Sequence, residues 1–375
     1  DAFRDRCFKA LMNISRISLY LGAFATMALS NAVVPVLALI TSDAAVQGAI
    51  YSAYFLGAFF MVFPAGWISD KIGRAPLIKI GLAGTFASGL LIWFFTGDPL
   101  LTVGFRFLEG LFTGMFVSSA LSFVNSQPEH TKLSGLYLAL MNVGMVAGLV
   151  IPGILSVIHP YAGVLVFSVL TGFAFLAGIF FREGSGFISV RIPVRMIFSI
   201  ALYHKWLWAA LFIFTGATGV VTSMYPEMSG YSAEISGVVT ALMSVSTAVC
   251  VYAVSRVSLL DSLGFLRRSA FILAISVPLV FFTPIGMILV GAVFGIISVA
   301  VLNYIAGTPH PQGMMNGLLI TMQYAGMAVL PFITGLIVIP LGYLGVFIIV
   351  GACVLLGGLL VVRCPCYAPA VKKGN

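Results

Sequence analysis

The sequence predicts an all-α polytopic membrane protein, with twelve transmembrane helices in two six-helix bundles. Of the 375 residues, 61% are hydrophobic and only 8% are charged, whereas soluble domains carry about 25% charged residues. The apolar runs are long and continuous, unlike the short alternating segments of a β-barrel. A crossing helix takes about 20 residues, so twelve would use roughly 240. This composition excludes a soluble enzyme.

The expected spans follow from apolar runs that end at glycine, proline or charged residues. The first six are residues 16–40, 45–68, 76–96, 99–124, 134–158 and 161–181. A more polar stretch follows at 183–204, and the last six are 205–226, 235–256, 269–283, 285–307, 313–338 and 341–362. The ninth is the shortest, because Pro278 and Pro284 crowd its apolar run.

The basic residues orient these spans. Eighteen of the 19 Lys and Arg residues lie at the termini or in connections on one side, and the opposite connections carry none. The positive-inside rule therefore predicts a multi-pass plasma-membrane protein with both termini in the cytoplasm. The net charge of +8 reflects this topology and weak attraction to membrane lipids, and no nucleic-acid partner is expected.

An internal repeat relates the two halves. The segment from Gly66 to Arg74 lies between spans two and three, and a similar segment from Asp261 to Arg268 lies between spans eight and nine. Asp70 and Asp261 are 191 positions apart (261 − 70). Repeats of this kind are common in transporters. The predicted domains are an N-terminal bundle (1–182), a cytoplasmic connector (183–204), and a C-terminal bundle with a short tail (205–375).

The repeated turn resembles the G-x-x-x-D-x-x-G-R signature of the major facilitator superfamily, and Arg106, Glu109 and Gly110 resemble that family's R-x-x-Q-G motif on span four. The first half is most similar to the drug:proton antiporter branch. The resemblance implies a monomeric secondary transporter of small molecules with no cofactor. One departure leaves the direction of transport open: Gly148 is followed by Leu149, where the antiporter signature expects proline.

The resemblance also implies a conformational latch on the cytoplasmic side. An acid in this turn can pair with a base one helical turn away or with a helix N-terminus. The alternative is a static turn with a solvated charge pair. The candidate latch residues are Gly66, Asp70, Gly73 and Arg74, with Asp261, Gly264 and Arg268 in the second copy.

Arg106 and Glu109 are charged residues inside an apolar span. Counted from Pro99 at 1.5 Å per residue, they lie about 10 and 15 Å deep, near the bilayer midplane. They are three residues apart and therefore share a helix face. Intramembrane charges usually face a cavity or a partner. We expect a proton-coupling site at Glu109 positioned by Arg106, and the alternative is a self-neutralising pair that only stabilises the bundle.

Polar residues on several spans, including the two charged residues of span four, are candidates for binding substrate, since the resemblance implies a cavity between the halves. Buried polar groups need hydrogen-bond partners, so some of them could instead join helices. The candidate set is Asn31, Arg106, Glu109, Asn142, Thr218, Thr222, Asn303, Tyr304 and Gln323.

Metal and nucleotide chemistry are not expected. Two Met-x-x-x-Met pairs (Met141 with Met145, Met224 with Met228) could suit Cu(I), but no His or Cys lies on the same spans in a suitable place. All four histidines fall in connections, which argues against a histidine proton relay. No phosphate-binding loop, dinucleotide fingerprint or zinc motif is present.

The leading functional hypothesis is proton-coupled efflux of small amphipathic organic molecules by alternating access. An alternative is uptake or facilitated diffusion of an organic anion or neutral metabolite bound by Arg106. A third hypothesis, from another class, is a non-transporting receptor or scaffold. No paired carboxylates or nucleophile–base spacing indicates an enzyme.

Overall fold

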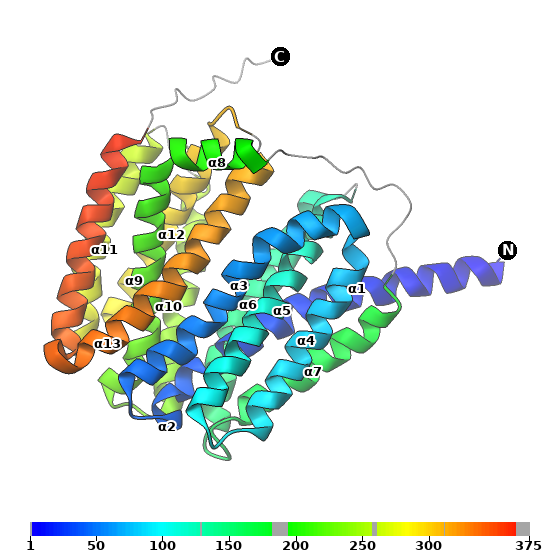
Figure 1. Ribbon diagram of the computed structural model, residues 1–375, viewed down its shortest axis with the longest axis horizontal. Helices are drawn as coiled ribbons and strands as arrows, with labels where there is room; N and C mark the ends of the chain where they lie inside the picture. Colours follow the sequence, from blue (N-terminus) through cyan, green and yellow to red (C-terminus); the bar gives the residue numbers. More distant parts are fainter. Residues whose placement is uncertain (1, 128–129, 182–193, 257–260, 311, 365–375) are drawn as a thin grey trace. The chain divides into compact units, whose positions relative to one another are not determined.

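The computed structural model describes residues 2–127, 130–181, 194–256, 261–310 and 312–364. All regular elements within these ranges are helices. In chain order they begin with α1 (Ala2–Asn31), η1 (Val34–Val36), α2 (Leu37–Ile40), α3 (Ala44–Ile72), α4 (Arg74–Phe94), α5 (Pro99–Asn125), α6 (His130–Leu155) and α7 (Ala162–Ile179). They continue with α8 (Val194–Tyr203), α9 (Lys205–Ser229), α10 (Ala233–Val254), α11 (Ser262–Phe282), α12 (Ile285–Ala306), α13 (Gln312–Leu360) and η2 (Val361–Arg363) (Figure 1).

The described residues include eleven helical segments that are long and apolar enough to cross a membrane. The last of them is 50 residues long and is divided by Gly342, whose φ of 68° and ψ of 166° are not helical. Only glycine adopts such a backbone conformation readily. The break yields the two final spans, so the prediction of a twelve-span helical membrane protein is confirmed.

Two span boundaries differ from those predicted. The ninth span begins at Ser262 instead of residue 269, because Asp261 caps α11 by accepting a hydrogen bond from the Gly264 backbone N–H. The first span is interrupted: α1 ends at Asn31, and Pro35 lies in the short helix η1 that follows. Proline lacks the N–H that a continuous helix would need.

The chain forms two compact units. The first contains residues 1–191 and 225–241, and the second contains residues 192–224 and 242–375. The division resembles the predicted bundles, except that residues 225–241 pack with the first unit. There Gln47 Nε2 donates a hydrogen bond of 3.0 Å to Glu227 Oε2. The last part of the predicted connector forms the helix α8.

Glycines bring α3 and α5 into backbone contact in the first unit. A Cβ atom added at Gly110 would lie 1.8 Å from the Tyr54 carbonyl oxygen, and one added at Gly57 would lie 2.1 Å from the Phe107 carbonyl oxygen. No larger residue fits at such distances, so small residues let the two helices touch. This contact sets Tyr54 beside the charged face of α5.

Candidate functional site

The candidate site is a buried ion pair on α5. The helix begins at Pro99, after Asp98 accepts hydrogen bonds from the backbone N–H groups of the first turn. Arg106 Nη1 lies 2.8 Å from Glu109 Oε2, and the two side chains are 1% and 0% exposed. The prediction that the two side chains share one face of α5 is therefore confirmed.

Arg106 also contacts two neighbouring helices. Its Nη2 donates a hydrogen bond of 2.8 Å to the Ser30 carbonyl oxygen on α1, and its guanidinium carbon lies 4.7 Å from the centroid of the Tyr54 ring on α3. A cation over an aromatic face is attracted by the ring quadrupole. Arg106 thus joins three helices of the first unit.

The pair is incompletely satisfied. Within the described part of the chain, Glu109 Oε1 and Arg106 Nε have no hydrogen-bond partner. One turn further along α5, the Thr113 hydroxyl lies 3.1 Å from the Thr85 hydroxyl of α4. A buried charge pair costs desolvation that its Coulomb attraction often fails to recover. Glu109 Oε1 can therefore still accept a hydrogen bond, and the Arg106 Nε–H can still donate one.

Of the predicted substrate-binding residues in the first unit, one lies near this pair. Asn31 is partly buried, and its amide donates to Met27 O and Ser30 Oγ, next to the carbonyl that holds Arg106. Asn142 is exposed and donates to Leu138 O on its own helix.

The remaining candidates lie in the second unit and do not form one cluster there. Thr218 and Thr222 are buried, but their hydroxyls donate to Thr215 O and Thr218 O of α9. Asn303 is exposed, and Tyr304 is buried. A cavity of about 50 Å³ is lined by Leu211, Phe294, Ile297, Ser298, Val301, Leu302, Leu319 and Gln323.

The first predicted latch turn has the backbone that its glycine implies. Gly73 has a φ of 88°, in the region that favours glycine. Arg74 Nη1 donates a hydrogen bond of 2.7 Å to Ser126 Oγ. The side chain of Asp70 lies outside the described residues. At Gly66 an added Cβ would meet Ser118 Oγ at 3.5 Å, which is ordinary contact.

The second copy of the turn is a helix cap. Asp261 Oδ1 accepts a 2.9 Å hydrogen bond from the Gly264 N–H, and a Cβ added at Gly264 would lie 1.8 Å from Asp261 Oδ2. Arg268 is exposed. Capping alone accounts for the Asp261–Gly264 spacing.

A histidine cluster in the second unit was not expected from the sequence. His204 is buried, and its Nδ1 lies 3.2 Å from the Tyr304 hydroxyl. The His204 and His310 ring centroids are 5.3 Å apart. Burial, with a smaller contribution from His310, lowers the pKa of His204 to about 4. The cluster joins the start of α9 to the end of α12, and only folding brings these connections together.

Within the described ranges, no group of three or more His, Cys, Asp or Glu side chains could hold a metal ion.

Comparisons with known proteins agree with this architecture. The family model of the Major Facilitator Superfamily matches residues 18–329. The chain is 31% identical over 134 residues to the class B tetracycline resistance protein of Escherichia coli. The aligned region covers 34% of this chain and 33% of that protein. It is 30% identical over 145 residues to the class G protein of Vibrio anguillarum, covering 36% and 35%. The chain thus aligns with about a third of the length of these relatives.

Solved transporter structures are similar in fold. The nucleoside transporter NupG superposes with a TM-score of 0.70 at 13% identity, covering 93% of this chain and 98% of that one. The human organic anion transporter MFSD10 gives a TM-score of 0.68 at 14% identity, covering 93% and 99%.

Proposed function

Because the chain belongs to the Major Facilitator Superfamily, we propose that it exports small amphipathic organic molecules in exchange for protons. Membership in the family makes it a membrane transporter of small molecules and not an enzyme. We further propose that it works as a monomer in the plasma membrane with both termini in the cytoplasm. The one-sided distribution of Lys and Arg supports this orientation.

The Arg106–Glu109 pair carries the proposal of proton coupling. Glu109 is a carboxylate that is 0% exposed, at the middle of a membrane-spanning helix. A proton that binds a Glu109 oxygen ends the ion pair, because the carboxyl is then neutral. Arg106 keeps its charge and its contacts with Ser30 and Tyr54. Protonation therefore leaves the buried Arg106 charge unbalanced and changes the forces that hold α5 against α1 and α3.

Export is supported by sequence similarity to two tetracycline resistance proteins. The names of these relatives support a tetracycline-like organic molecule as the kind of substrate. The alternative is uptake or facilitated diffusion of an organic anion or neutral metabolite at Arg106. One observation favours it: Arg106 Nε has no partner among the described residues, so an anion could compete with Glu109 for the guanidinium. The similar fold of an organic anion transporter is consistent with that alternative.

Reconstitution in liposomes separates the two candidates, with tetracycline and ethidium as probes. Proton-coupled exchange predicts accumulation of a transported probe inside vesicles whose lumen is acidic, and loss of that accumulation when nigericin collapses the pH gradient. Facilitated diffusion predicts equilibration that ignores the gradient. Proton-coupled uptake predicts accumulation in vesicles with an alkaline lumen.

A further inference from the structure

Two cations of the second unit share one indole ring. Lys205 Nζ lies 5.1 Å from the centroid of the Trp206 ring, and the guanidinium carbon of Arg363 lies 5.0 Å from the same centroid. The two positive groups are therefore no more than about 10 Å apart. Lys205 is the first residue of α9, and Arg363 is the last residue of η2.

These two cations have no acidic partner among the described residues. Neither Lys205 nor Arg363 forms an ion pair there, and the Asp261 carboxylate caps α11. Further bases lie at the same ends of the second unit's helices, and we call the whole set the basic end. Its members are Arg195, Lys205, Arg256, Arg267, Arg268 and Arg363. Like charges repel, so this end favours an anionic partner.

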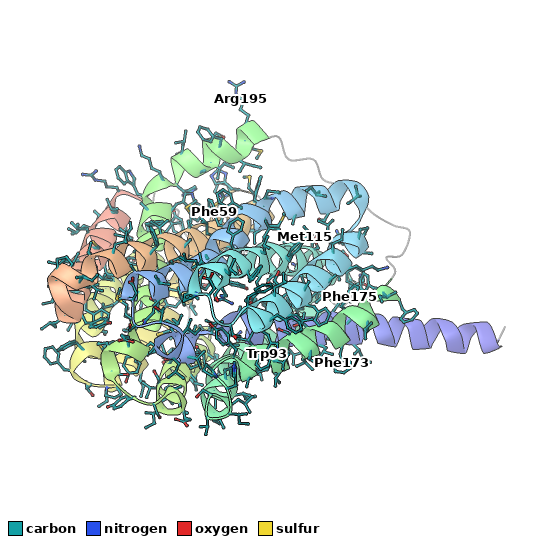
Figure 2. All side chains as sticks on the ribbon, turned by 60° about the horizontal axis from the view of Figure 1, so that its bottom comes forward. Phe59, Trp93, Met115, Phe173, Phe175 and Arg195 are labelled. Atoms are coloured by element: carbon teal, nitrogen blue, oxygen red, sulfur yellow. The ribbon has the colours of Figure 1, made fainter. Side chains whose placement is uncertain are left out.

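Apolar side chains are exposed beside these cations. The helix α8 runs across the direction of α9 at the end where α9 begins (Figure 1). Phe198 and Leu202 on α8 are 66% and 54% exposed, whereas Ile200 is buried. Val362, next to Arg363, is 60% exposed. Figure 2 shows Arg195 pointing away from the ribbon at the start of α8.

This combination fits the boundary between lipid headgroups and acyl chains. Exposed aromatic and aliphatic residues on a short helix lie favourably there, with basic side chains extending to the phosphates. The position of α8 is fixed by continuity, because it ends at Tyr203 and the membrane-spanning α9 starts at Lys205. An aqueous protein surface would gain nothing from exposing Phe198 and Leu202.

We propose that Lys205 and Arg363, held on Trp206, bind the phosphate of an anionic phospholipid, while Phe198 and Leu202 lie in the adjoining acyl boundary. The indole limits the motion of both cations, so the phosphate meets two preoriented charges. The site is separate from the Arg106–Glu109 pair, which lies in the first unit, and it does not depend on which molecule is transported.

Native mass spectrometry of the purified full chain in detergent tests the site, with phosphatidylglycerol, phosphatidylcholine and inorganic phosphate as probes. Each cation near an anionic lipid contributes enough that losing two should weaken binding at least tenfold. We expect K205Q/R363Q to bind phosphatidylglycerol at least tenfold more weakly than the native chain. The matched control R267Q/R268Q removes the same charge from the same end and should change binding less than twofold. K205R/R363K keeps both charges and should retain binding.

Four results would overturn the proposal. Equal weakening in K205Q/R363Q and R267Q/R268Q would mean diffuse attraction and no site. Equal binding of phosphatidylcholine and phosphatidylglycerol would remove the requirement for an anionic headgroup. Displacement of phosphatidylglycerol by inorganic phosphate at equal concentration would show that free phosphate, and not a lipid, is the ligand. If K205R/R363K also lost binding, the effect would come from altered packing on Trp206 and not from charge.

Discussion

Arg106 Nη1 donates a hydrogen bond of 2.8 Å to Glu109 Oε2 on one face of α5, and both side chains are buried. The pair is held from two sides, by the Ser30 carbonyl and the Tyr54 ring. Such a pair can stabilise the fold, serve transport, or do both. The two roles make different predictions, because stability responds to whether charges are balanced, whereas proton coupling needs the carboxylate itself.

Removing one partner of the pair should destabilise the protein more than removing both. R106M and E109L each leave a buried charge without its partner, which typically costs about 3–5 kcal/mol. The double variant R106M/E109L has no buried charge at this site, so its free energy of unfolding should return close to that of the native chain. It should nevertheless have lost proton-coupled transport. Chemical unfolding in detergent measures the free energy of unfolding, and flux in liposomes measures transport. A double variant less stable than either single variant would contradict this account.

Gly110 should be essential for the contact between α3 and α5. A Cβ there would lie 1.8 Å from the Tyr54 carbonyl oxygen, so G110A must push the helices apart, and overpacking of this kind costs about 1–3 kcal/mol. Gly104 on the same helix has nothing within 4 Å of an added Cβ, so G104A is a matched control that should be neutral or stabilising. Thermal unfolding compares the two variants, and equal unfolding temperatures would show that α3 and α5 are not held this closely.

The two roles open to Asp261 can be separated by two substitutions. As a helix cap, its side chain accepts a hydrogen bond from the Gly264 N–H. D261A should therefore cost about 1 kcal/mol, whereas D261N should retain most of the stability because asparagine caps equally well. Both can be measured by thermal unfolding. If D261N stays stable but loses transport, the negative charge is needed and the latch role implied by the family resemblance is supported over capping alone.

Acid should loosen the histidine cluster. His204 has a folded-state pKa of about 4, below the value of about 6.5 for an unperturbed histidine. The folded state therefore binds fewer protons than the unfolded state between these values. The stability present above pH 6.5 is lost as the pH falls from 6.5 towards 4, at about 1 kcal/mol per pH unit. Unfolding of the native chain and of H204Q at pH 7.5, 6 and 5 checks this. If the stability of the native chain and that of H204Q changed equally with pH, the burial of a neutral His204 would be ruled out.

The transmembrane architecture could be predicted from the sequence because the bilayer leaves few alternatives. An apolar run of about 20 residues must form a helix there, since its backbone polar groups find no water. The start of the ninth span could not be predicted, because the cap at Asp261 lies outside the apolar run. The interruption of the first span near Pro35 could not be predicted from hydropathy, because the residues after Asn31 remain apolar although α1 ends there.

The site was predicted in part for a similar reason. Arg106 and Glu109 stand out because charges are rare in an apolar run. Their neighbours Ser30 and Tyr54 do not stand out, because a backbone carbonyl and an aromatic face become partners only when helices cross. Thr113 could have been found, since it continues the polar face of α5 one turn beyond Glu109. Thr218 and Thr222 show the opposite case: their hydroxyls bond to their own helix, as threonine often does.

The most direct test of the account is the effect of E109Q on transport driven by a pH gradient. The substitution keeps size and polarity but removes the protonatable group, and E234Q on α10 removes an acid outside the site as a control. We expect E109Q to lose accumulation in vesicles with an acidic lumen while it still exchanges labelled for unlabelled probe without a gradient, and we expect E234Q to keep both activities. Accumulation by E109Q at the native level would contradict proton coupling through Glu109.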